Sequence, residues 1–366
     1  MLIEKIEVWD FCPTMRDGQY AMSHVVMDCI WGRIYRAVTD QGQEGWGETV
    51  FPPSVPRSEQ IELIAQEREL LGSLVKSPAE ALLAQAERLR QLGKGGCGVA
   101  FGLETVWYDL AARESGSSLS GFLGGVKSES VPDYFSISER TLPRIRERIK
   151  IAGTGRTVFQ LKIGVGSFDD DADQLELVLG EIGPGQIVLA DANGGWDVEG
   201  ACRMLSRFSD PRLLWEEPCD TYTANREVMK RTGRRLMVDQ CAADPEIAQE
   251  VIKDGLAHSL CIKPAFLGGL STARAIRDSC ARTGTKMRID GPWCGDIATA
   301  AILHLAVGAP QDLLVSGCDL REPVLIEPDM QGVITQDNTR ISPPGGAGLG
   351  LSVTKDALGE PEATYR

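Results

Sequence analysis

Short apolar runs recur at regular intervals along the second half of the chain, and they constrain its fold more than any other feature. There are eight of them from Val131 onward, each followed by glycine, proline or acidic residues and then by a helical stretch. Eight successive β–α units are what an eight-stranded parallel barrel requires. We therefore predict an α/β protein with a (β/α)8 TIM barrel over residues 129–320. The runs are VPDYFSI, VFQLKIG, QIVLADAN, RLLWEEP, RLMVDQ, HSLCIKP, KMRID and DLLVSG.

The segments on either side of the barrel predict a second, smaller domain. Residues 1–50 contain strand-like stretches rich in β-branched and aromatic residues, with a turn at DQGQEG. Residues 58–114 place apolar residues at i, i+3, i+4 and i+7, the spacing of amphipathic helices. These patterns indicate an N-terminal α+β capping domain over residues 1–128. The loop-rich segment 321–366 is expected to pack back on that domain.

The composition argues against several classes of function. The formal net charge of −14 argues against nucleic acid or an anionic membrane as a partner. No uncharged apolar run approaches the roughly 20 residues that a membrane span needs. The ten cysteines include no Cys-x-x-Cys pair, so neither a zinc site nor a redox motif is indicated. The first residues lack the pattern of a signal peptide, and we expect a reduced, cytoplasmic protein that acts on a small molecule.

Carboxylates end three successive apolar runs. Asp191 ends the third run, Glu216 the fourth and Asp239 the fifth, and strand ends are where barrel enzymes carry their chemistry. Three crowded anions repel one another unless a cation lies among them. An all-oxygen set of this kind suits Mg²⁺ or Mn²⁺. The alternative is that each acid caps a following helix or pairs with an arginine.

Lysines end the second and the sixth runs. In a closed ring of eight strands, Lys162 and Lys263 would face each other across the mouth, with the three carboxylates on the arc between them. A divalent cation and a dry pocket both lower the pKa of a lysine, which makes it a usable base. We infer abstraction of a proton α to a carboxylate, through a metal-stabilised enediolate. Return of the proton by the opposite lysine inverts the carbon, whereas protonation of a β-leaving group expels water. Lys162 could instead extend its amine to solvent.

These motifs resemble the enolase superfamily, in its mandelate racemase and muconate lactonizing branch, nearly end to end. GWGE at 45–48 and WYDLAARESGSSLSGFLGG at 107–125 are similar to the capping domain of that family. LKIG, LADAN, WEEP and IKPAFLGGL are similar to its barrel motifs. The resemblance implies an enolase-like, modified barrel and a homo-oligomer with a carboxylate substrate.

The resemblance also assigns roles to individual residues. It implies that Glu216, rather than Glu217, is the metal ligand of the fourth strand, and that Asn193 supports the metal. The remaining assignments that it implies are Asp191 and Asp239 as metal ligands and Lys162 and Lys263 as the paired acid and base.

Two positions depart from the commonest family pattern. Gln160 stands where the family usually has the first lysine of Lys-x-Lys, and Gln240 follows Asp239 where the family usually has glutamate. A Gln-x-Lys form is similar to the subgroup of hydroxyproline betaine epimerases and cis-3-hydroxyproline dehydratases, so Gln160 is expected beside the site. His258 precedes its strand and His304 lies in an apolar helix, and we interpret both as structural.

Loops above the barrel mouth are expected to hold the rest of the substrate. Tyr20, Phe51 and Trp293 could form an aromatic cage around a quaternary ammonium, or they could be packing residues. Asp290 or Asp319 could pair with a primary or secondary ammonium.

The sequence therefore predicts a Mg²⁺-dependent racemase or epimerase of a proline-like or N-methylated cyclic amino acid. A dehydratase acting on a hydroxyproline-type substrate is the alternative. Two further hypotheses are a metal-binding barrel without catalysis and Schiff-base chemistry at one lysine. The complete set of lysines and carboxylates disfavours both.

Overall fold

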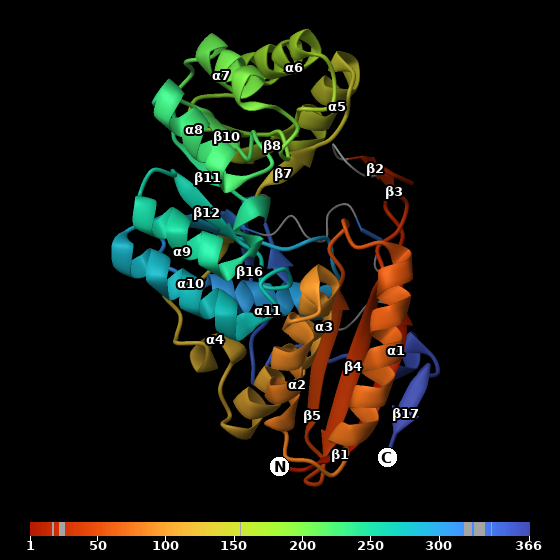
Figure 1. Ribbon diagram of the computed structural model, residues 1–366. Helices are drawn as coiled ribbons and strands as arrows, with labels where there is room; N and C mark the ends of the chain where they lie inside the picture. The colour runs from red at the N-terminus through yellow and green to blue at the C-terminus, as the bar shows by residue number, and fades with distance from the viewer. Residues whose placement is uncertain (17, 22–25, 154, 318–323, 326–333, 338) are drawn as a thin grey trace.

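The computed structural model places an N-terminal domain beside a larger domain of alternating strands and helices (Figure 1). Within the described ranges, no helix combines the length and the apolar character needed to cross a bilayer. The described residues are 1–16, 18–21, 26–153, 155–317, 324–325, 334–337 and 339–366.

The N-terminal domain is built on a four-stranded antiparallel sheet in the order β17-β1-β4-β5. Its strands are β1 (Ile3–Phe11), β4 (Gly32–Thr39), β5 (Glu44–Val50) and β17 (Ala363–Tyr365). The last strand of the chain therefore pairs with the first one, with Ile6 opposite Tyr365. In Figure 1 both chain ends accordingly lie at this sheet.

Helices cover one face of the capping sheet and bury its apolar side chains. They are α1 (Arg57–Leu74), α2 (Ala81–Arg90) and α3 (Gly93–Glu114), and the short α4 (Leu119–Phe122) follows. α3 lies so close to β5 that a Cβ atom on Gly47 would collide with the carbonyl oxygen of Gly102. The glycine within the GWGE motif is thus required by close backbone approach.

The larger domain contains one eight-stranded parallel sheet whose strands follow one another in chain order. Each of the eight apolar runs contains one of these strands, which confirms the predicted barrel-type α/β fold. The strands are β7 (Phe135–Ile137), β8 (Val158–Lys162), β9 (Ile187–Asp191), β10 (Leu213–Glu216), β11 (Leu236–Val238), β12 (Ser259–Ile262), β13 (Lys286–Ile289) and β14 (Leu314–Gly317).

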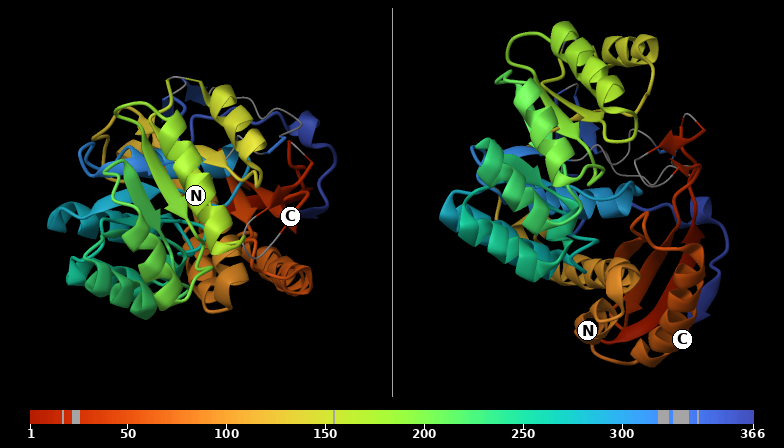
Figure 2. Two further views of the ribbon diagram at one scale, coloured as in Figure 1. Left: turned by 90° about the horizontal axis from the view of Figure 1, so that it is seen from above. Right: turned by 45° about the horizontal axis from the view of Figure 1, so that its top comes forward.

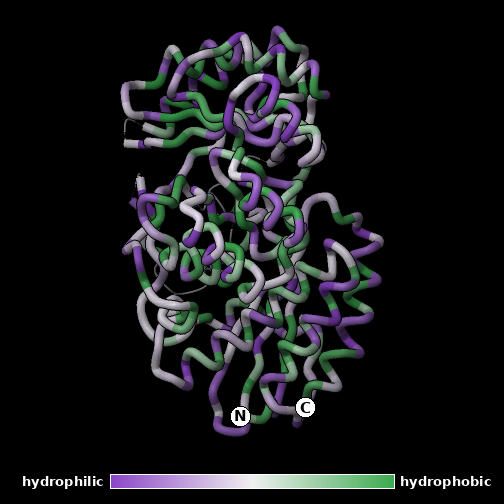
Figure 3. Tube along the Cα trace, turned by 60° about the vertical axis from the view of Figure 1, so that its left-hand side comes forward, coloured by the Kyte–Doolittle hydropathy of each residue, from purple (hydrophilic) through white to green (hydrophobic). Residues whose placement is uncertain are grey.

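Helices connect these strands and lie on the outside of the curved sheet (Figure 2). Hydrophilic and hydrophobic residues alternate along most of them, as expected for helices with one buried face (Figure 3), whereas every residue of the last one, Asp296–Ala306, is buried. They are α5 (Leu142–Ala152), α6 (Phe168–Glu181), α7 (Val198–Arg207), α8 (Tyr222–Thr232), η1 (Gln240–Ala243), α9 (Pro245–Asp254), α10 (Leu270–Thr283) and α11 (Asp296–Ala306).

The two edge strands of the sheet meet at a seam. Among the described strands no hydrogen-bonded ladder joins β7 to β14. Instead β6 (Val131–Pro132) lies beside β14, because a Cβ on Gly317 would come 2.8 Å from Cγ1 of Val131. β6 in turn pairs with β16 (Arg340–Ser342) of the C-terminal segment. The eighth helix expected after β14 would fall largely outside the described residues.

The pleat of the strands explains why polar residues could be placed in such apolar runs. Side chains of a strand alternate between its two faces. In β8, Phe159 and Leu161 pack outward into the main core, whereas Val158, Gln160 and Lys162 share the inner face. The inner face is therefore apolar at the start of the strand and polar at its carboxyl end, which places the polar groups at one mouth of the barrel.

Candidate active site

Five predicted residues stand at the carboxyl ends of five consecutive strands, β8 to β12. Strand pairing sets Lys162 beside Asp191, and Asp191 beside Glu216. Asp239 and Lys263 directly follow β11 and β12. The side chains of the three acids and Lys162 are buried, with at most 7% of Lys162 exposed to solvent. Lys162 therefore points into the barrel rather than out to solvent.

Each lysine pairs with one outer member of the carboxylate trio. Lys162 Nζ lies 2.6 Å from Asp191 Oδ2. Lys263 Nζ lies 2.8 Å from both carboxylate oxygens of Asp239 and donates a hydrogen bond to Oδ2. The two amines are thus held at different ends of the trio, with Glu216 between the two ion pairs.

Amide groups bridge the first two carboxylates. Gln160 Nε2 donates to Asp191 Oδ2 at 3.0 Å and to Glu216 Oε2 at 3.1 Å. The backbone N–H of Asn193 donates to Asp191 Oδ1 at 2.9 Å, and its side-chain Nδ2 donates to Oδ2 at 3.0 Å. Asn193 takes this position with a left-handed φ of 46°. Both amides orient the carboxylates.

Glu217, next to Glu216, is turned away from the trio. Its φ of 40° directs the side chain to the backbone after β11. There it accepts hydrogen bonds from the N–H groups of Asp239, at 2.7 Å, and Cys241, at 2.8 Å. Glu217 therefore supports the loop that carries Asp239, and Glu216 faces the two aspartates.

Arg288 of β13 enters the same site and was not among the predicted residues. Its guanidinium is bidentate on Glu216, with Nη1 2.9 Å from Oε2 and Nη2 on Oε1. Nη2 also lies 3.8 Å from Asp239 Oδ2, and Nε lies 3.4 Å from Asp290 Oδ2. The strand period could have found this residue, because Arg288 stands two positions before Asp290 and so shares its face.

The ion pairs set the protonation of the site. Burial alone would lower the pKa of Lys162, but Asp191, Tyr20 and Glu216 together outweigh burial and raise it. Asp239 likewise raises the pKa of Lys263 against the effect of burial. Without a metal, both pKa values are therefore raised by direct pairing with carboxylates, and the lowering expected for a base stays a prediction for the metal-bound site. Burial would also raise the pKa of Asp239, yet Lys263 and Arg288 lower it to about 2.

Crowding of the three carboxylates has its largest effect on the pKa of Glu216. Burial, together with the charges of Asp191 and Asp239, raises its pKa to about 7 despite the neighbouring Arg288. Repulsion of this kind is relieved by a cation placed among the carboxylates. The trio therefore has the electrostatics of a site for positive charge.

The donor set fits a hard divalent cation, although it is not gathered around one point. In the described part of the chain, no three Asp, Glu, His or Cys side chains converge closely enough to hold a metal ion as they stand. Lys162, Arg288 and the Gln160 amide contact the carboxylate oxygens instead. The Asp239 Oδ1 atom is buried and accepts no hydrogen bond from a described residue. The three carboxylates are nevertheless oxygen donors of the kind that Mg²⁺ and Mn²⁺ prefer.

The predicted aromatic cage forms only in part. The rings of Tyr20, in β2 (Tyr20–Ala21), and Trp293 lie 4.3 Å apart between centroids, and the Tyr20 hydroxyl is 2.6 Å from Ser136 Oγ. Ser136 in turn contacts Gln160 Oε1 at 3.5 Å, so Tyr20 reaches the edge of the site. Phe51 packs in the core of the capping domain and does not join them.

Asp290 and Asp319 are the two carboxylates predicted to pair with a substrate ammonium group. Asp290 is buried and accepts hydrogen bonds from the Tyr134 hydroxyl and the Gly291 N–H, both at 2.9 Å. It also faces Arg288, so its charge is already engaged within the barrel. Asp319 lies outside the described residues.

Carboxylates of the capping domain fix that domain over the barrel. The N-cap residues of α10 and α11 are Gly269 and Gly295, which have no side chain to cap a helix. Glu48 of the GWGE motif accepts hydrogen bonds from the N–H groups of Gly295, at 2.6 Å, and Ala298, at 3.1 Å. Glu104 of α3 accepts one from Ser271 in the first turn of α10, at 3.2 Å. Anions at helix N-termini are stabilising, so the two domains are joined by helix capping.

The histidines interpreted as structural make local contacts. His304 uses both ring nitrogens: Nδ1 accepts from the Ser120 N–H at 3.3 Å, and Nε2 lies 3.1 Å from the carbonyl oxygen of Leu349. His258 Nδ1 lies 3.1 Å from Ser259 Oγ, at the opposite end of β12 from Lys263. Neither histidine contacts the carboxylate trio.

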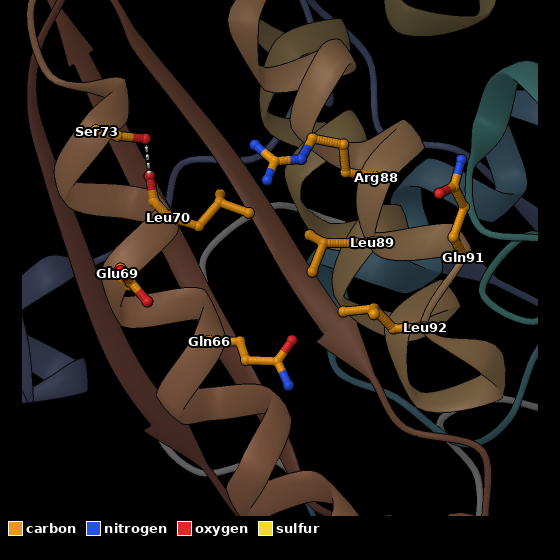
Figure 4. Close-up of a pocket in the computed structure, with 8 residues that line it drawn as sticks. All are labelled: Gln66, Glu69, Leu70, Ser73, Arg88, Leu89, Gln91 and Leu92. Carbon is orange, nitrogen blue, oxygen red and sulfur yellow. Dashed lines mark hydrogen bonds between the residues drawn. The ribbon is translucent and has the colours of Figure 1, made fainter.

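A cavity of about 580 Å³ lies away from this site, between α1 and α2 of the capping domain (Figure 4). None of the residues predicted for the site lines it. Its walls are formed by Gln66, Glu69, Leu70, Ser73, Arg88, Leu89, Gln91 and Leu92.

Comparison with known proteins adds family evidence to this geometry. The family model described as "Enolase C-terminal domain-like" matches residues 144–357, more than half of the chain. Cis-3-hydroxy-L-proline dehydratase of Roseibium aggregatum is 28% identical over 373 residues, covering 100% of both proteins. L-Ala-D/L-Glu epimerase of Bacillus subtilis is 24% identical over 338 residues, covering 90% of this chain and 91% of that protein.

A solved structure is similar over the whole length. It is a mandelate racemase/muconate lactonizing enzyme from Roseovarius nubinhibens ISM complexed with magnesium, with 26% sequence identity and a TM-score of 0.87. The similarity covers 100% of this chain and 100% of that one.

Proposed function

Because the chain belongs to the enolase superfamily, in its mandelate racemase and muconate lactonizing enzyme-like branch, we propose that it is a Mg²⁺-dependent enzyme that removes the α-proton of a carboxylate substrate. The observation that carries the proposal is the pairing of Lys162 and Lys263 with opposite ends of one carboxylate trio. A solved relative that contains magnesium supports the choice of metal.

Asp191, Glu216 and Asp239 would hold the metal. A bound divalent cation supplies positive charge that stabilises the anion formed when a carboxylate loses its α-proton. Gln160 and Asn193 keep the Asp191 carboxylate in place through their amide hydrogen bonds. The trio and the amides that hold it thus form a surface above which a substrate carboxylate can be oriented.

The two lysines are the proton carriers. Each amine lies next to a different outer carboxylate, so a substrate bound above the trio would have one amine on each side. One lysine takes the α-proton, and the other delivers a proton to the opposite face of the same carbon. The expected reaction is inversion at the α-carbon, which is racemisation or epimerisation.

We assign the substrate to the proline-like cyclic amino acids, N-methylated forms included. Support comes from Gln160 in place of the first lysine of Lys-x-Lys, and from the relative that acts on cis-3-hydroxy-L-proline. Tyr20 and Trp293, which pack together at the edge of the site, offer an apolar wall for such a ring.

The second candidate is a dehydratase, and a specific observation favours it. The similarity to the relative named cis-3-hydroxy-L-proline dehydratase covers the full length of this chain and of that protein. In that reaction one lysine takes the α-proton, and the other protonates the departing 3-hydroxyl group. The same residues serve both reactions, so the substrate decides between them.

Proton NMR in D₂O separates the two candidates. L-proline, its N,N-dimethyl betaine and cis-3-hydroxy-L-proline would each be incubated with the enzyme and Mg²⁺. Replacement of the α-proton by deuterium with the ring retained supports epimerisation, whereas loss of the hydroxyl with a new enamine or imine supports dehydration. Absence of both with every substrate of the series would refute the assignment to proline-like substrates.

A further inference from the structure

We propose that Arg288 is a positioning residue of the metal site, a built-in counter-cation that holds Glu216 and competes with the divalent metal for it. The inference rests on the proposed function, since it concerns the same carboxylates. It goes further than that function, because it explains how a protein with three buried carboxylates stays folded before any metal binds.

The contacts of Arg288 differ from those of the two lysines. Lys162 and Lys263 pair with the outer aspartates, and Arg288 is the cation that contacts both oxygens of the central Glu216. A guanidinium bound to a carboxylate through two parallel hydrogen bonds is oriented as well as attracted. Arg288 therefore fixes the rotation of the central carboxylate.

Arg288 is also fixed in place by its own surroundings. Only 1% of the residue is exposed, and Nε lies 3.2 Å from Cys261 Sγ and 3.4 Å from Asp290 Oδ2. Its guanidinium carbon lies 5.4 Å from the centre of the Tyr134 ring. A lysine amine can move on its flexible stem, whereas this guanidinium is enclosed on several sides and stays beside Glu216.

The charge of the site gives Arg288 its role. Four carboxylates, Asp191, Glu216, Asp239 and Asp290, face three cations, which leaves one negative charge in excess when all are ionised. Without Arg288 the excess would be two, and Glu216 would be a buried carboxylate with no cationic partner of its own. A buried charge without a partner is strongly destabilising.

The same charge must weaken metal binding. Arg288 occupies both Glu216 oxygens and places a positive charge next to the incoming cation. Its removal should therefore destabilise the metal-free protein and strengthen the binding of Mg²⁺. A purely structural arginine would lower stability without changing the affinity for metal.

The test compares Arg288→Met with Arg277→Met by thermal unfolding and by calorimetric titration with MgCl₂. Arg277 is the matched control, because it is 2% exposed and binds Asp278 and the carbonyl oxygens of Leu305 and Leu123, away from the trio. Both variants should unfold at lower temperature than the wild type in EDTA. Only Arg288→Met should regain the loss in Mg²⁺ and bind Mg²⁺ about tenfold more tightly, which corresponds to about 1.4 kcal/mol.

Three results overturn the inference. Equal or weaker Mg²⁺ binding by Arg288→Met, with normal binding by the wild type, refutes the counter-cation role and leaves the proposed function intact. Equal recovery of both variants in Mg²⁺ does the same. Absence of Mg²⁺ binding by the wild type refutes the metal site itself, and the inference with it. If Arg288→Met does not fold, Arg288→Gln takes its place, with Arg277→Gln as control and the same criteria.

Discussion

Glu48 of the capping domain and Gly295 of the barrel domain are joined by a hydrogen bond of 2.6 Å from the Gly295 N–H to the Glu48 carboxylate. The glycine leaves room for the acid, since a Cβ atom at Gly295 would come 2.8 Å from Glu48 Oε2. A helix whose own N-cap residue has no side chain to accept hydrogen bonds is therefore capped from another domain. The GWGE motif thus serves the junction of the domains rather than the chemistry.

Replacing Glu48 with alanine should weaken this junction. The change leaves the first N–H groups of α11 without an acceptor in a buried place, and loss of a helix cap costs about 1–2 kcal/mol of the free energy of unfolding. Urea unfolding followed by circular dichroism measures the loss. Glu44→Ala is the control, since Glu44 pairs with Arg36 at the surface of the same strand. An equal loss in both variants would contradict the capping role.

Gly269 at the start of α10 should not tolerate a side chain. Its φ is 149°, and a Cβ atom there would collide with Glu104 Oε2. We expect Gly269→Ala to lower the free energy of unfolding by about 3 kcal/mol. Gly284→Ala, at the other end of the same helix, has φ of 70° and free space around the Cβ position, so it should cost about 1 kcal/mol. Equal losses would show that backbone strain alone decides.

Lys162→Ala and Lys263→Ala should each abolish turnover while Mg²⁺ binding persists. In an epimerase each variant keeps one amine, which can still exchange the α-proton of one enantiomer with solvent. Deuterium incorporation into the separate L and D substrates should therefore be lost for opposite enantiomers in the two variants. Loss of exchange for the same enantiomer in both would contradict the placement of one amine on each face.

Glu216→Gln and Glu217→Gln should differ in metal binding although the residues are neighbours. Glu216 faces the two aspartates, whereas Glu217 accepts the backbone N–H groups of Asp239 and Cys241. Calorimetric titration with MgCl₂ should show at least a tenfold loss of affinity for Glu216→Gln, about 1.4 kcal/mol or more. Glu217→Gln should retain Mg²⁺ binding. The opposite order would move the ligand assignment to Glu217.

His304 should make folding stability depend on pH. Burial lowers its pKa from 6.5 to about 4 in the folded protein, so the unfolded chain binds more protons between these values. Stability from this group is complete above pH 6.5 and is lost as the pH falls to about 4, by roughly 3 kcal/mol. Urea unfolding at pH 7 and pH 5 should show a smaller decrease for His304→Leu than for the wild type. An unchanged decrease would contradict a neutral His304.

Local patterns in the sequence were sufficient for the strands and for much of the site. The apolar runs mark the strands because parallel strands in a barrel are buried on both faces. Asp191, Glu216 and Lys162 could be placed because they end such runs. Arg288 was missed because it lies inside its run, where only the alternation of faces distinguishes it from the neighbouring outward residues.

Other features depend on contacts between distant segments. Phe51 follows an aromatic-rich strand, and nothing local shows that it turns into the capping core instead of toward Tyr20. The acceptor roles of Glu48 and Glu104 depend on helices more than 160 residues further along the chain. The ion pairs that raise the pKa values of the two lysines in the absence of metal could not be read from the sequence for the same reason, because only the folded arrangement creates them.

The pairing of β17 with β1 has a consequence for the order of folding. A ribosome makes β1 before the barrel strands, yet the edge partner of β1 is the segment Ala363–Tyr365, which is made after them. The barrel strands are all synthesised in between and pair with their neighbours in sequence, so they can assemble as they emerge. The cap is therefore begun before the barrel and completed after it, and the nascent protein carries an open sheet edge until β17 has been made.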